Sequence, residues 1–92
     1  MTYSKLFTEL NDKADSCSDN LDITGLSEVL MKFASLGSSI SEPMLQAKID
    51  GDKDTYRAYQ RLDKDIGRKM NAIRSRLSAL KVEKERIHEA QI

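Results

Sequence analysis

Three aspartates, Asp50, Asp52 and Asp54, have the alternating spacing with which an EF-hand calcium loop begins. The rest of such a loop is missing, because Thr55 stands where a turn glycine is needed and Arg61 where a bidentate glutamate closes the site. These carboxylates suit a helix start better, since an N-cap acceptor and negative charge both stabilise the first turn. The sequence therefore predicts a capped helix at this point and no metal site.

His88 and Cys17 are the only residues of their types in the chain. Catalysis or metal binding by a histidine needs convergent partner groups, and His88 lies near the chain end between glutamates. Cys17 lies in a polar segment without a sequence-adjacent base to activate its thiol. We therefore expect no catalytic residue, no cofactor and no enzyme activity.

A window from Ile66 to Val82 contains five basic residues and no acidic one. Basic groups along a helix can follow a phosphate backbone by counterion release, which makes this window a candidate nucleic-acid surface. Few aromatic residues lie between the charges, however, and basic residues near a helix C-terminus also suit the helix dipole. The candidate residues are Arg68, Lys69, Arg74, Arg76 and Lys81.

Length and composition indicate one small all-α domain over residues 1–92. The chain has one proline, four glycines and 33% charged residues, which is more typical of helices than of a sheet. Its single cysteine excludes an internal disulfide, and no segment resembles an export signal or a membrane span, so we expect a cytoplasmic protein.

The two parts of this domain differ in charge. Residues 1–52 hold four Lys/Arg against nine Asp/Glu, a net charge of −5, whereas residues 53–92 hold eleven against six, a net charge of +5. Such asymmetry is compatible with a basic arm for nucleic acid, or with an acidic part that folds back on a basic helix. Because the two charges cancel, the sequence favours the second interpretation.

The acidic part predicts three short helices. The first begins at Thr2 or Ser4 and ends near Ala14, and a polar loop follows over residues 15–20. The second begins at Asp22 or Thr24, and Gly37 is placed to end it as a left-handed C-cap.

A capping box predicts the third short helix. Ser39 stands three residues before Glu42, and Pro43 lies just inside the helix that these two residues would cap. We expect Gly51 to break the chain after this helix, although a bend through Gly51 is the alternative.

Residues 54–90 predict one long amphipathic helix. Its apolar residues recur at steps of three and four, with an extra four-residue step around Gly67 that resembles a coiled-coil stutter. This seam consists of Tyr59, Leu62, Ile66, Met70, Ile73, Leu77 and Leu80. A basic stripe of Arg57, Arg61, Lys64 and Arg68 falls on the opposite side.

The length of this helix predicts a binding surface. It spans about 55 Å, while a compact chain of this size has a radius of gyration of about 12 Å. We expect the upstream helices to cover its first half only and to leave the seam beyond Met70 bare for coiled-coil self-association or a partner. The predicted partner-binding residues are Tyr56, Tyr59, Met70, Ile73, Leu77, Leu80 and Ile87.

The start of the long helix resembles a known family. Gly51, Asp52, Tyr56, Tyr59, Gln60, Arg61 and Lys64 are similar to the start of the second helix in YscE-type small co-chaperones of bacterial type III secretion. The resemblance implies a helical hairpin that pairs with a helical-repeat chaperone, with both tyrosines and the apolar face of residues 62–73 toward that partner. This chain is longer at both ends than the family, and its second helix becomes more basic.

The sequence thus predicts a non-enzymatic helical interaction protein, such as an adaptor, co-chaperone or inhibitor. Its partner would be another protein, a second copy of the chain, or both, and we expect neither a membrane nor a small-molecule substrate as a ligand. One alternative is a small nucleic-acid-associated accessory protein that uses the basic window. A structural component of a phage or secretion assembly is a further alternative.

Overall fold

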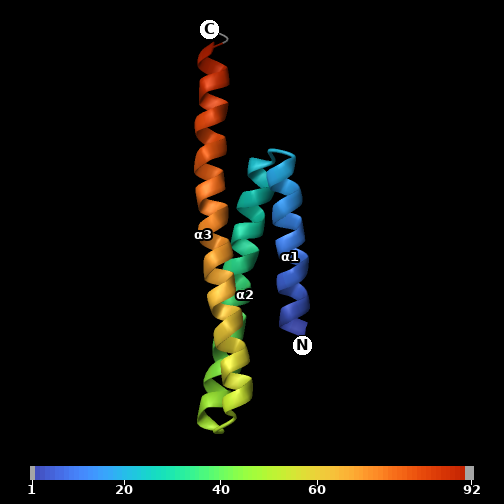
Figure 1. The fold of residues 1–92 in the computed structure, drawn as a ribbon, viewed down its shortest axis with the longest axis vertical. Helices are drawn as coiled ribbons and strands as arrows, with labels where there is room; N and C mark the ends of the chain where they lie inside the picture. The colour runs from blue at the N-terminus through green and yellow to red at the C-terminus, as the bar shows by residue number, and fades with distance from the viewer. Residues whose placement is uncertain (1, 91–92) are drawn as a thin grey trace.

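The protein is all-helical, as a computed structural model that describes residues 2–90 shows. It consists of α1 (Thr2–Asp19), α2 (Ile23–Ile49) and α3 (Lys53–Ala90), which run alternately up and down (Figure 1). The molecule is a rod of 62 × 17 × 15 Å with a radius of gyration of 16.6 Å. The prediction of an all-α fold is therefore confirmed, although the expected division of residues 1–52 into three short helices is wrong.

Helix α1 is longer than the sequence predicted. It continues through the expected loop as far as Asp19 because Ala14 and Cys17 are both buried in the core. The chain then turns through a Schellman motif, in which the Leu21 N–H bonds the Ser18 carbonyl and the Asp22 N–H bonds the Cys17 carbonyl. Leu21 occupies the left-handed position, with φ of 57°.

Helix α2 begins as predicted but does not end where predicted. Asp22 is its N-cap and accepts a 2.9 Å hydrogen bond from the Gly25 N–H. The helix then continues through Gly37, and Pro43 lies inside it rather than at the start of a new helix. A break at Gly37 is therefore wrong, because Leu36 and Ile40 are buried on one stripe that only a continuous helix keeps aligned.

The turn between α2 and α3 follows the predicted local rules. Gly51 has a φ of 73° and breaks the chain in a second Schellman motif. Asp52 then caps α3, accepting a hydrogen bond of 3.2 Å from the Thr55 N–H and one of 2.7 Å from its hydroxyl. Both bonds favour the carboxylate and lower the pKa of Asp52. The break at Gly51 and the long helix after it are confirmed.

The core lies where all three helices meet. Phe33, Leu26, Ile40 and Val29 of α2 are its most completely buried large side chains, and α3 adds its seam from Tyr59 to Leu80. Helix α1 covers one side of the α2–α3 pair, with Phe7 packed edge-on against Phe33 at 5.7 Å between ring centroids. At one end α3 extends beyond the α1–α2 turn, and at the other the α2–α3 hairpin extends beyond the start of α1 (Figure 1).

Candidate interaction surface

The second half of the α3 seam is covered within the chain. Ile73, Leu77 and Leu80 are 3%, 7% and 4% exposed, and Met70 is partly buried against the same core. The expectation that these side chains are bare is wrong, because the longer α1 and the start of α2 reach the height of Leu80. The exposure on which their assignment as partner-binding residues depended is therefore not found.

The limit of internal packing lies after Leu80 rather than at Met70. Every side chain from Lys81 to Arg86 is exposed, including Val82 at 51%. Ile87 and His88 lie outside the residues whose side chains the structure describes, so the predicted role of Ile87 stays a prediction.

The two tyrosines at the start of α3 have different environments. Tyr59 is 9% exposed and packs edge-on against Tyr3, with 6.1 Å between the ring centroids. Tyr56 is half-buried, and the Lys48 ammonium lies 5.9 Å from the centre of its ring. Only Tyr56 therefore offers part of its ring to a partner in the isolated chain.

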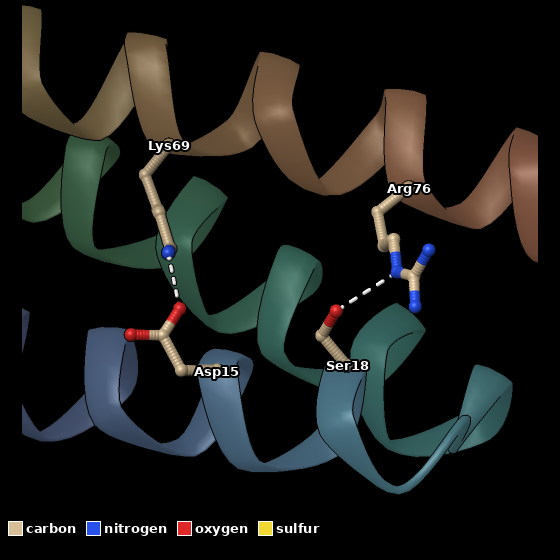
Figure 2. Close-up of polar contacts among 4 residues, drawn as sticks. All are labelled: Asp15, Ser18, Lys69 and Arg76. Atoms are coloured by element: carbon tan, nitrogen blue, oxygen red, sulfur yellow. Dashed lines mark hydrogen bonds and ion pairs between the residues drawn. The ribbon is translucent and has the colours of Figure 1, made fainter.

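The five residues of the basic window do not share one face. The Lys69 ammonium forms a 2.8 Å ion pair with Asp15, and the Arg76 guanidinium donates a 2.9 Å hydrogen bond to the Ser18 hydroxyl (Figure 2). Arg74 instead bonds Asn71 and, with Lys81, lies about 140° around the helix from Lys69 and Arg76. Within the window, Lys69 and Arg76 therefore contact α1, whereas the other basic residues lie on other faces of α3.

A different set of basic residues is aligned along α3. Lys53, Arg57, Arg61, Lys64 and Arg68 follow one another at steps of four, four, three and four, and all are exposed. We call these five residues the outer basic stripe. By helical geometry the acidic residues between Lys53 and Arg68, which are Asp54, Asp63 and Asp65, fall outside the stripe's arc of about 80°.

One edge of α2 is left uncovered by the other two helices. The α1-facing edge of α2 carries Lys32, Ser35 and Ser39, which line a groove with α1. The opposite edge carries small and apolar residues between positions 27 and 45, a range that the structure describes in full, and the exposed Glu42 lies at its margin, about 20° around the helix from Met31. We call this surface the open edge; it consists of Ser27, Leu30, Met31, Ala34, Gly37, Ser38, Ser41, Met44 and Leu45.

Large apolar side chains of the open edge are solvent-exposed. Met31 is 71% exposed and Leu45 is 57% exposed, and Ile49 continues the edge at 69%. Leu30 and Met44, two further members of the edge, are partly buried against the core. This surface was not predicted from the sequence, although the steps from Ser27 through Met31, Ala34, Ser38 and Ser41 to Leu45 alternate between four and three.

A second apolar feature is the groove between α1 and α2. Its cavity of about 470 Å³ is lined by Tyr3, Leu6, Leu10 and Leu36, with Glu9, Lys13 and Lys32 at its margin. Leu6 is 42% exposed there. Because the margin holds both signs of charge on flexible side chains, this groove indicates no particular ligand chemistry.

The residues whose side chains could bind a metal or act as nucleophiles lie apart from one another. Asp50 accepts a hydrogen bond from Gln46, Asp52 caps α3, and Cys17 is buried beside Gly25. Within the part of the chain that the structure describes, no group of three potential metal ligands converges. No helix among the described residues is long and apolar enough to cross a membrane.

Comparisons of the sequence with protein-family models and with curated proteins, and of the fold with solved structures, found no match. The open edge and the outer basic stripe therefore have to be interpreted from their own chemistry.

Proposed function

We propose that the protein is a non-enzymatic helical interaction module, of the adaptor, co-chaperone or inhibitor kind, that binds through the open edge of α2. The observation that supports this most directly is the exposure of Met31 and Leu45 on an uncharged helix edge. Scattered apolar residues are normal on protein surfaces, whereas an aligned set without charges is typical of a helix that packs on both sides.

The energetics of this edge support association. Full burial of a methionine or leucine side chain is worth about 1.5 to 3 kcal/mol, so Met31, Leu45 and Ile49 together can stabilise a complex substantially. Methionine adapts its shape to irregular partner surfaces. Ala34, Gly37 and Ser38 lie between the large residues and would let the backbone of a partner helix approach closely.

Point substitutions on the open edge test this proposal. Tagged wild-type protein and the Leu45→Glu and Met31→Glu variants would be used to capture binding proteins from cells of the native source, with mass spectrometry as the readout. Ser39→Glu is the matched control, because Ser39 is exposed on the α1-facing edge of the same helix. We expect both open-edge variants to lose the partner and the control to keep it, with unchanged helix content in circular dichroism.

Retention of every captured protein by both open-edge variants would contradict the proposal. If the partner is a second copy of the chain, copurification of tagged and untagged chains of both open-edge variants would likewise contradict the proposal. The control variant excludes a general effect of an added negative charge on α2.

The outer basic stripe supports a second candidate function, a nucleic-acid-associated accessory protein. Its five basic residues extend over about 22 Å of helix, roughly the distance over which a helix can follow several backbone phosphates. Binding of a short DNA duplex should then weaken steeply with salt and should decrease further in Arg61→Glu. An absence of any DNA or RNA shift at low salt would exclude this candidate.

A further inference from the structure

We infer that the open edge binds the open edge of a second copy of this chain, with the two α2 helices antiparallel and a two-fold axis passing near Ser38. This inference rests on the proposed function, because it names the partner of the surface proposed there. It commits to a homodimer, and association with a different protein or with nucleic acid becomes an outcome of the test.

The arrangement of residue sizes along the open edge is self-complementary. Met31 lies seven residues before Ser38 and Leu45 seven residues after it, so an antiparallel copy places Met31 of one chain against Leu45 of the other. The smaller residues Ala34 and Ser41 lie between these large ones. An interface between identical patches must have this property, because each patch has to fit itself after a two-fold rotation.

The neighbouring edge of α3 is small at the same height. Gly37 of α2 lies beside Ile66, since a Cβ added to Gly37 would be 3.8 Å from the Ile66 Cγ2. Gly67, the next residue of α3, is exposed, and a Cβ added to it would meet nothing within 4 Å. Both helices therefore lack a side chain near the middle of the face, which allows the two copies to approach closely at the axis.

The available area is sufficient for a dimer. The edge from Ser27 to Ile49 is about 33 Å long, and the adjoining edge of α3 widens the face to about two helix diameters, or 20 Å. Such a face offers about 650 Å² per copy, and thus about 1,300 Å² in all, within the 1,200 to 2,000 Å² typical of stable interfaces.

Charge does not oppose this pairing. The residues of the open edge are uncharged and the formal net charge of the chain is zero, while the exposed Glu42 at the margin of the edge would lie opposite Ala34 of the other copy. Two copies therefore approach without like charges facing each other at the centre and without net repulsion. The outer basic stripe lies about 40° to 120° around α3 from Gly67.

Disulfide trapping tests the position of the axis. In a Cys17→Ala background, Ser38→Cys should form an intermolecular disulfide under mild oxidation. Facing Cα atoms of two closely packed helices lie about 3.5 to 5.5 Å apart, which overlaps the range of about 4.4 to 6.8 Å that a disulfide requires. Ser39→Cys in the same background is the matched control and should remain monomeric, because Ser39 faces the α1 side.

A mixed pair of variants tests the antiparallel direction. Met31→Cys and Leu45→Cys chains, each in the Cys17→Ala background, should crosslink to each other much more than to themselves. Efficient crosslinking of each variant with itself would instead indicate parallel helices and would overturn the inference.

Sedimentation equilibrium of the unmodified chain gives the independent measurement. We expect a monomer–dimer equilibrium that Leu45→Glu weakens about thirtyfold or more, because the substitution removes an apolar contact twice in a symmetric dimer. Ser39→Glu should leave the equilibrium unchanged.

A monomer at every concentration, with no Ser38→Cys disulfide, would overturn the second-copy inference. If Leu45→Glu nevertheless lost a captured protein from cells, the proposed function would stand with a different partner. If the chain neither self-associated nor lost a captured protein in Leu45→Glu, and DNA bound to the outer basic stripe, the second-copy inference and the proposed interaction function would both be wrong. The second candidate function would then be favoured.

Discussion

Gly67→Ala should stabilise the isolated chain, and this prediction tests whether the surface of α3 at Gly67 is free of contacts within the chain. Gly67 lies fourteen residues inside α3, where glycine is conformationally costly. A methyl group at this position would meet nothing within 4 Å, so no steric term opposes the gain in helix propensity.

The expected magnitude follows from that propensity. Replacing glycine by alanine in an exposed helix interior is worth about 0.5 to 1 kcal/mol. In a domain of this size, 1 kcal/mol shifts the melting temperature by about 4 to 8 °C, so Gly67→Ala should raise it by about 2 to 8 °C. The free energy of unfolding should increase by the same 0.5 to 1 kcal/mol in urea titrations.

The assay needs a dilute sample and a matched glycine. Unfolding should be followed by circular dichroism at concentrations at which the wild type sediments as a monomer, so that contacts across a two-fold axis do not enter. Gly25→Ala is the control with the opposite sign, because its Cβ would collide with the Asp22 carboxylate and lie 2.7 Å from the Cys17 Sγ. A Gly67→Ala variant no more stable than the wild type would refute the reasoning, since it would mean that something packs on Gly67 in the monomer.

Substitutions at three further positions probe the turns and the core. Leu21→Gly should be about 1 kcal/mol more stable than Leu21→Ala in chemical denaturation, because only glycine relieves the left-handed backbone; equal stabilities would contradict the strain. Ile73→Ala should cost about 2 to 5 kcal/mol of monomer stability at any protein concentration, and a loss of dimer without loss of stability would show that Ile73 faces a partner instead. Asp52→Asn keeps a cap acceptor but does not titrate. Because folding lowers the pKa of Asp52, its carboxylate stabilises the fold above its unfolded pKa and loses this effect as the pH falls through the lowered value. The advantage of wild type over this variant in thermal melts should therefore narrow in strong acid, and a constant gap would argue against the cap.

The sequence predicted the elements that depend on neighbouring residues. Asp22 and Asp52 were among the predicted N-cap candidates, and a break was predicted at Gly51; each of these features needs only a few adjacent side chains and backbone groups. The long helix after Gly51 was equally readable from its apolar periodicity.

Predictions failed where burial outweighed local preference. Gly37 and the Ser39 capping box are good signals for a helix boundary, yet α2 continues because its apolar stripe is buried on both sides of that point. The polar segment after Ala14 stays helical for a related reason, since Cys17 is buried there and Asp15 pairs with Lys69.

The candidate site depended on the same distinction. Periodicity identified the apolar face of α3 but not which residues cover it, and the structure shows Ile73 to Leu80 buried against α1 and α2. The open edge of α2 carries an equally regular pattern that the stronger core stripe of the same helix obscured in the sequence.

By itself the sequence determined an all-helical chain, its caps, its turn at Gly51 and its long basic helix, because these follow from interactions within a few residues. Tertiary structure decided where α1 ends, that α2 is continuous, and which of two apolar faces stays exposed. These outcomes depend on contacts between residues far apart in the chain, since an apolar stripe specifies that it will be buried but not which surface will bury it.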